Sequence, residues 1–116
     1  MKTIFILENY LKDKCRKAGL DLIAEHQFST KRKFKFDYCI PDPLIKIAFE
    51  YQGGLYMPKG GHTNVKGFIR DCDKINLAQK EGWKVFLFTA DHLNNSLNKT
   101  LDFIDGVFLD IKRGLK

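Results

Sequence analysis

The sequence predicts an α/β domain with a mixed sheet flanked by helices, its elements arranged in the order αβββαβα. Two observations support this prediction. Some segments place apolar residues every three or four positions, as helices do, whereas the segments between them alternate apolar and polar residues or are apolar throughout, as strands do. A chain of 116 residues has room for one packed core, so we expect residues 1–116 to form a single domain.

The predicted elements are a helix over 4–18, strands over 22–28, 33–40 and 44–52, a helix over 68–80, a strand over 83–89 and a helix over 93–115. Gly19 is placed to end the first helix, and Pro41-Asp42-Pro43 predicts a turn. The long loop over 53–67 is rich in glycine, and Gly106 is a candidate interruption of the last helix. The second helix is expected to have an apolar side formed by Phe68, Ile69, Cys72 and Ile75.

Two acidic residues, Asp37 and Glu50, stand inside strands that otherwise read as core, although acidic residues are poor strand formers. We expect Ile40 to face Ile45 across the turn. One face of the strand pair is then wholly apolar, with Phe34, Phe36, Tyr38 and Ile40 opposite Tyr51, Phe49, Ile47 and Ile45. In this register Asp37 lies opposite Ala48, and Glu50 is diagonal to Asp37 on the other face, about 7–8 Å away.

Two carboxylates that converge on a half-buried face repel each other unless a cation joins them. Oxygen ligands favour Mg²⁺, so a metal site at Asp37 and Glu50 is one interpretation. The other is that these acids pair with Lys35 and Lys46 on an exposed face. Glu8 lies at the edge of the buried stripe of the first helix, where it either points across the core toward the sheet or is an ordinary helix-edge glutamate.

Composition adds two expectations. Twenty basic residues against fourteen acidic ones give a net charge of +6, which fits a nucleic-acid partner. Three cysteines without a CxxC pair favour free thiols in a reducing compartment, so we expect a cytoplasmic protein. No segment approaches the ~20 uncharged apolar residues of a membrane span, and we expect no membrane partner.

Taken in order, several motifs resemble the PD-(D/E)XK nuclease superfamily, and in particular its small single-domain branch of very-short-patch-repair-type and phage endonucleases. The matching features are Glu8 in the first helix, Phe36-Asp37-Tyr38 and Ile47–Gly54 in strands, His62 in the glycine loop, Gly67, Asp71, Lys74 and Asn76 in or near the second helix, and Gly82-Trp83-Lys84-Val85. The resemblance implies a restriction-endonuclease-like core. It also implies Mg²⁺-dependent hydrolysis of DNA phosphodiester bonds, with Mn²⁺ as a substitute, in a bacterial or phage-infected cell.

The resemblance also implies roles for individual residues. Asp37, Glu50 and the carbonyl of Tyr51 are expected to hold the metal, with Glu8 supporting a second ion or its waters. His62 is expected to act as an acid or base, or to bind phosphate, unless it is only an exposed loop residue. Gln52 stands where the motif has a lysine, and Lys74 from the next helix is the candidate to replace that charge, if it is not an ordinary solvated lysine.

The literal Pro-Asp dipeptide of the motif is Pro41-Asp42, but Asp42 lies in a turn between prolines, so Asp37 is the preferred metal ligand. The residues expected to contact DNA phosphates are Lys31, Arg32, Lys33, Lys35, Lys59 and Lys66, the last two in the glycine loop. Because Gln52 lacks a charge, a non-catalytic nucleic-acid-binding domain with the same fold is the main alternative, and an assembly module is a third. A single small domain favours either a homodimer or cleavage selective for DNA structure.

Overall fold

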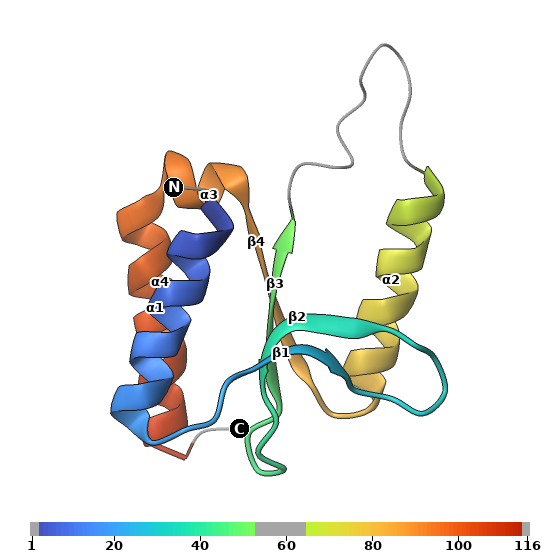
Figure 1. The fold of residues 1–116 in the computed structure, drawn as a ribbon, viewed down its shortest axis with the longest axis horizontal. Coiled ribbons are helices and arrows are strands. Elements are labelled where there is room, and N and C mark those ends of the chain that lie inside the picture. The colour runs from blue at the N-terminus through green and yellow to red at the C-terminus, as the bar shows by residue number, and fades with distance from the viewer. Residues whose placement is uncertain (1–2, 53–64, 115–116) are drawn as a thin grey trace.

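A four-stranded mixed sheet lies between two layers of helices in the computed structural model of the protein (Figure 1). The structure describes residues 3–52 and 65–114. Its elements are α1 (Thr3–Ala18), β1 (Ile23–Gln27), β2 (Lys35–Ile40), β3 (Ile47–Gln52), α2 (Val65–Lys80), β4 (Lys84–Thr89), α3 (Ala90–Asn94) and α4 (Leu97–Lys112). The strand order is β1-β2-β3-β4, with two antiparallel pairs followed by a parallel pair. The predicted fold class is confirmed.

The parallel pair of β3 and β4 determines where α2 lies. Parallel neighbours need a crossover connection, and α2 occupies that crossover. It therefore covers one face of the sheet, while α1 and α4 cover the other (Figure 1). In the parallel register Gln52 at the end of β3 lies beside Thr89 at the end of β4, so both strands end at the same edge of the sheet.

The larger core cluster lies between the sheet and the α1–α4 layer. Leu7 and Leu11 from α1, Phe49 from β3 and Ile104 from α4 are fully buried there, and Phe108 stacks on Phe49 with ring centroids 6.2 Å apart. Burying a side chain of this size contributes about 1.5–3 kcal/mol. A smaller cluster on the α2 side consists of Phe36, Cys39, Ala48, Ala78 and Trp83. None of the helices that the structure describes is long and apolar enough to cross a membrane.

The end of the first helix agrees with its prediction. Gly19 has a φ of +69°, a left-handed conformation that glycine adopts without strain. The backbone N–H groups of Gly19 and Leu20 donate to the carbonyls of Arg16 and Cys15 at 3.2 and 2.9 Å. These bonds satisfy carbonyls that the end of the helix leaves without a partner.

The predicted last helix is instead two helices, and Gly106 does not interrupt either of them. Thr89 caps α3, because its hydroxyl accepts the N–H of His92 at 3.1 Å and the His92 ring accepts the N–H of Thr89 at 3.0 Å. The break falls at Asn95 and Ser96, residues whose side chains compete with the helix for backbone hydrogen bonds. Gly106 lies inside α4, where a single glycine is tolerated.

The second helix also differs from its prediction. It begins at Val65, so Lys66 lies in its first turn and not in a loop. The expected apolar side is only partly covered, since Phe68 and Ile69 are 51% and 54% exposed. The physical reason is that α2 meets the sheet through its C-terminal part, where the small Ala78 packs against the cluster around Trp83.

The register of β2 and β3 differs from the expected one by two residues. Ile40 lies opposite Ile47, and not opposite Ile45. Asp42 causes the difference: its carboxylate accepts the N–H of Leu44 at 2.9 Å, and its carbonyl accepts those of Ile45 and Lys46 at 2.8 and 2.9 Å. This wider turn delays the start of β3 to Ile47. A slip of two keeps the faces of β3 unchanged.

The alternation predicted for the second strand fails at Asp37. Tyr38 and Ile40 pack on the α1–α4 side, but Phe36 lies on the α2 side, where its ring centroid is 4.8 Å from that of Trp83. Glu25 on the neighbouring strand has a φ of +54°, and the ladder skips the pair that it would form with Asp37. The pleat is interrupted there, so the expected apolar row of Phe34, Phe36, Tyr38 and Ile40 is wrong.

Candidate functional site

Glu50 is the buried acidic residue of β3. The strand alternates as predicted: Phe49 and Tyr51 face the α1–α4 layer, whereas Ala48 faces α2, and Glu50 shares the face of Ala48. Only 4% of Glu50 is exposed. A buried carboxylate is unfavourable without hydrogen bonds or a counter-charge, so its partners define the site.

The carboxylates of Asp37 and Glu50 each accept a hydrogen bond from a backbone N–H of the neighbouring strand. The N–H of Asp37 donates to Glu50 Oε2 at 2.6 Å, and the N–H of Tyr51 donates to Asp37 Oδ2 at 2.8 Å. The observed register, continued by one step from Tyr38 and Phe49, puts Asp37 directly opposite Glu50. The expected diagonal arrangement is therefore replaced by a closer one, in which both carboxylates lie where regular pairing of β2 and β3 ends.

Lys74 of α2 completes this group. Its ammonium contacts Glu50 Oε1 in an ion pair whose side chains are 14% and 5% exposed. It also lies over the ring of Phe36, 5.9 Å from the centroid. Lys74 is thus directed at the sheet rather than into solvent, and it stands next to β3, the strand that ends in the uncharged Gln52.

The electrostatics of the group are dominated by burial. Loss of solvation raises the pKa of Glu50 above its ordinary value, the Lys74 charge opposes the increase, and the Asp37 charge adds to it. The group holds two carboxylates and one ammonium, which is paired with Glu50, so a further cation is favoured electrostatically. Within the described residues, Asp37 Oδ1 accepts no hydrogen bond, whereas the second oxygen of Asp37 and both oxygens of Glu50 have partners.

Glu8 lies on the other side of β2. Its Oε1 accepts the hydroxyl of Tyr38 at 2.8 Å, and its Oε2 is 3.5 Å from Lys12 Nζ. Burial and the Glu8 hydrogen bond raise the pKa of Tyr38 well above its usual value, so this hydroxyl stays a donor. Of the two alternatives for Glu8, the structure therefore shows the one in which it points toward the sheet, but its contact is with Tyr38 and not with Asp37 or Glu50.

The remaining predicted site residues are scattered or lie outside the described residues. His62 and Lys59 belong to the latter. Gln52 is half-buried at the end of β3. The predicted DNA contacts that the structure describes are all exposed. They are Lys31, Arg32 and Lys33 before β2, Lys35 in β2 and Lys66 in α2. Asp42 is an exposed turn residue and does not lie in a strand.

Arg70 is a neighbour of this region that the sequence prediction missed. Its guanidinium lies 5.5 Å from the centre of the Phe34 ring, and that of Arg32 lies 4.3 Å from the same centre. The signal was present in the spacing, since Lys66, Arg70 and Lys74 recur every four residues and so share one side of a helix.

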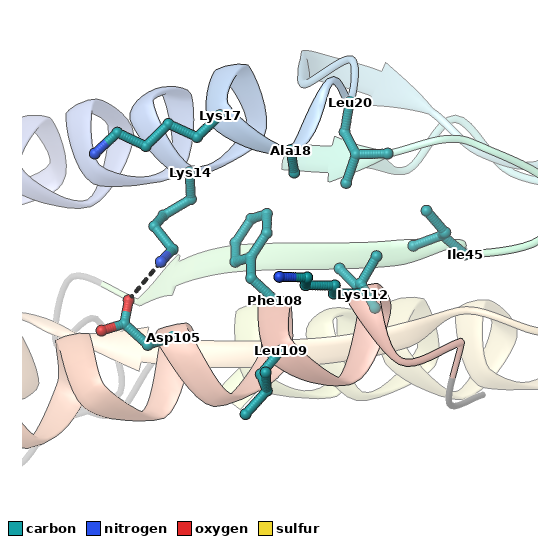
Figure 2. A pocket seen from close by; sticks show the side chains of 10 residues that line it. Lys14, Lys17, Ala18, Leu20, Ile45, Asp105, Phe108, Leu109 and Lys112 are labelled. Atoms are coloured by element: carbon teal, nitrogen blue, oxygen red, sulfur yellow. Dashed lines mark ion pairs between the residues drawn. The ribbon is translucent and has the colours of Figure 1, made fainter.

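A pocket of about 710 Å³ lies away from these residues, between the C-terminal parts of α1 and α4 (Figure 2). Lys14, Lys17 and Lys112 stand around an apolar floor that includes Leu20 and Phe108. Lys14 Nζ lies 3.1 Å from Asp105 Oδ1. The sequence-predicted site residues do not line this pocket, which is on the α1–α4 side of the sheet.

Comparison with known proteins supports the fold. No family model and no curated protein matches the sequence. Among solved structures, the catalytic domain of the homing endonuclease I-Bth0305I is similar, with a TM-score of 0.59 and 19% sequence identity over 88% of this chain and 92% of that chain. The four-stranded mixed sheet flanked by helices is therefore a nuclease-like fold.

Proposed function

We propose that this protein is a Mg²⁺-dependent DNA endonuclease of the PD-(D/E)XK type. The observation that carries the proposal is the meeting of Asp37 and Glu50 from adjacent strands, with Lys74 against Glu50. The fold likeness to a homing endonuclease catalytic domain supports it. Each of these features alone has an ordinary structural explanation, but together they supply oxygen ligands for a metal ion and a positive charge for a phosphate, which metal-assisted phosphodiester hydrolysis uses.

The donor set suits a hard divalent cation. Asp37 Oδ1 accepts no hydrogen bond in the described part of the chain, and Glu50 Oε1 already attracts the ammonium of Lys74. These two oxygens, with the carbonyl of Tyr51, are the atoms proposed to hold Mg²⁺ or Mn²⁺. Two protein carboxylates and several waters are a usual arrangement for Mg²⁺, and the described residues hold no cluster of three or more acidic, histidine or cysteine ligands.

When bound, the ion would lower the pKa of a coordinated water and offset negative charge on the phosphate. In the hydrolysis the water oxygen bonds to phosphorus, one bridging P–O bond breaks, and the leaving oxygen takes up a proton. Lys74 would offset the charge that develops on the phosphate oxygens. Gln52, which is uncharged, would orient the attacking water, and His62 is proposed to supply or accept the proton.

Plasmid cleavage tests the proposal. Supercoiled DNA is incubated with Mg²⁺ or Mn²⁺ and the wild-type protein, Asp37→Asn, Glu50→Gln or the matched control Asp42→Asn. We expect each of the first two variants to lose at least about 100-fold in rate, as removal of a group that stabilises the transition state does. Asp42→Asn should cut normally, since an exposed turn residue keeps its hydrogen bond as asparagine.

A second readout separates metal binding from catalysis. Mn²⁺ should raise the melting temperature of the wild-type protein in the absence of DNA, since a ligand that binds only the folded state stabilises it. Asp37→Asn should lose that increase. Equal cleavage by wild type and Glu50→Gln would contradict the proposal, as would cleavage that persists in EDTA.

One observation favours a second candidate, a nucleic-acid-binding domain without turnover. Lys74 already neutralises Glu50, and Gln52 adds no positive charge. Such a protein would bind DNA with a steep dependence on salt and yield no product with either metal. The same plasmid assay, run beside a DNA-binding titration, distinguishes the two.

A further inference from the structure

A buried aromatic ring brings two arginines together beside the candidate site. Phe34 is only 3% exposed. Arg32, from the connection between β1 and β2, lies with its guanidinium carbon 4.3 Å from the ring centre, and Arg70, from α2, lies at 5.5 Å. Both distances are within the range of a cation–π contact, so segments far apart in sequence place two guanidinium groups against one ring, with their central carbons at most about 10 Å apart.

No carboxylate of the described residues is ion-paired with either of these two guanidiniums. Both arginines are exposed. One arginine would suffice to cover the ring. A second like charge held on the same ring is unfavourable unless an anion lies between or beside the two. The arrangement is therefore suited to an anionic ligand that both guanidiniums contact.

The position of Arg70 indicates which anion. Arg70 precedes Lys74 by one turn of α2, a rise of about 6 Å along the helix, and Lys74 contacts Glu50. Phosphates follow each other along a DNA strand at about 3.4 Å of axis per nucleotide. A backbone with one phosphate at Asp37 and Glu50 would thus carry another phosphate past Arg70 within one or two nucleotides.

We propose that Arg32 and Arg70 form a phosphate clamp. The clamp holds the DNA backbone one or two nucleotides from the phosphodiester bond that is cleaved at Asp37 and Glu50. This inference rests on the proposed nuclease function and specifies how its substrate is held. Contact with Phe34 restrains both guanidinium groups before DNA arrives, so less side-chain freedom is lost on binding. The planar fork of arginine also allows two parallel hydrogen bonds to one phosphate, which lysine cannot make.

The clamp is tested by DNA binding in EDTA, where cleavage does not interfere. Fluorescence anisotropy with a labelled 20-base-pair duplex is measured against salt for wild type, Arg32→Gln, Arg70→Gln and Arg70→Lys. Arg113→Gln is the matched control, since Arg113 is an exposed arginine at the end of α4, in the opposite helical layer. Thermal melts verify that each variant is folded.

We expect each Arg→Gln variant to lose about tenfold in affinity, the typical cost of a hydrogen bond to a charged group. The slope of log K against log salt should fall by about one for each variant. Arg70→Lys should keep the slope, because it keeps the charge, but lose affinity, because it loses the fork and the stacking on Phe34. Arg113→Gln should resemble wild type.

Two results would overturn the clamp: glutamine variants that bind no worse than Arg113→Gln, or an Arg70→Lys variant that binds as tightly as wild type. Failure of the nuclease proposal looks different, because DNA would then be bound through both arginines without any product in Mg²⁺ or Mn²⁺. Normal plasmid cleavage and normal binding by the glutamine variants would instead reject the clamp and leave the nuclease proposal intact. A wild-type protein that binds no DNA rejects both.

Discussion

Replacing Lys74 with methionine is expected to destabilise the protein strongly at alkaline pH. Methionine keeps most of the packing volume of lysine but leaves Glu50, which is 4% exposed, without its counter-charge. Two unit charges about 4 Å apart at an effective dielectric constant of 20 interact by about 4 kcal/mol. Breaking a buried pair by removing one partner costs about 3–5 kcal/mol. We expect a loss of about 3 kcal/mol in the free energy of unfolding at pH 8, near the lower limit, because Glu50 can take up a proton.

The dependence of this loss on pH has a definite sign. Burial holds the pKa of Glu50 above its ordinary value even beside Lys74, and removal of Lys74 takes away the interaction that opposes the increase. In Lys74→Met the neutral carboxyl is therefore favoured in the folded state. The loss should be small below the unfolded pKa of about 4.3. It should grow as pH rises through the higher folded value, so the deficit relative to wild type is larger at pH 8 than at pH 4.

Urea denaturation followed by circular dichroism measures both quantities, and a melting-temperature decrease of roughly 10 °C at pH 8 accompanies the expected loss. Glu50→Gln alone should also destabilise, since it leaves Lys74 unpaired in a largely buried site. The double variant should recover most of the loss, with an interaction energy of about 3 kcal/mol between the two sites. A deficit below about 1 kcal/mol, typical of surface pairs, or an equal deficit at both pH values, would refute this reasoning.

Other predictions concern the fold. The pKa of Asp105 is lowered by its hydrogen bond from Tyr10 and its pairing with Lys14, so its contribution is present above the unfolded pKa and lost as pH falls through the folded value. Asp105→Asn should thus cost less than about 1 kcal/mol at pH 7, because the site is solvent-screened, and almost nothing at pH 2 in the same urea titration. Gly106→Ala should stabilise by about 0.5–1 kcal/mol, as in a helix interior, since apart from its chain neighbours and the backbone of its own helix no atom lies within 4 Å of the added Cβ. A lower melting temperature would contradict this prediction. Gly19→Ala has equal space but a φ of +69°, so it should destabilise by about 1 kcal/mol, and an unchanged melt would show that the left-handed turn is not strained.

Much of the fold could be predicted from the sequence because the spacing of apolar residues within one segment favours either a helix or a strand. The stripe of Leu7, Leu11 and Cys15 specifies α1, and the buried faces of β3 follow from its strict alternation. Errors arose where turn hydrogen bonds or an unusual backbone conformation override the pattern of apolar and polar side chains. The Asp42 hydrogen bonds widened a turn that its prolines had suggested was tight, and the left-handed Glu25 moved Phe36 to the other face.

The candidate site was predictable only in part, for the same reason. That acids stand inside apolar strands is visible from the sequence, and it led to Asp37 and Glu50. Their mutual binding through backbone N–H groups depends on a register that the turn decides. Arg70 had no signal beyond its four-residue spacing, because its relation to Phe34 exists only once α2 lies over the sheet.

The order of amino acids alone thus determined the strands, most of the helices and the presence of two costly carboxylates among apolar neighbours, since side-chain periodicity indicates which face is hidden from water. Tertiary structure alone decided that Lys74 meets Glu50, that Glu8 meets Tyr38 instead, and that two arginines share one ring. Those contacts join residues separated by many positions. Their geometry is set by the crossover of α2 and by strand register, which depend on the whole chain packing at once.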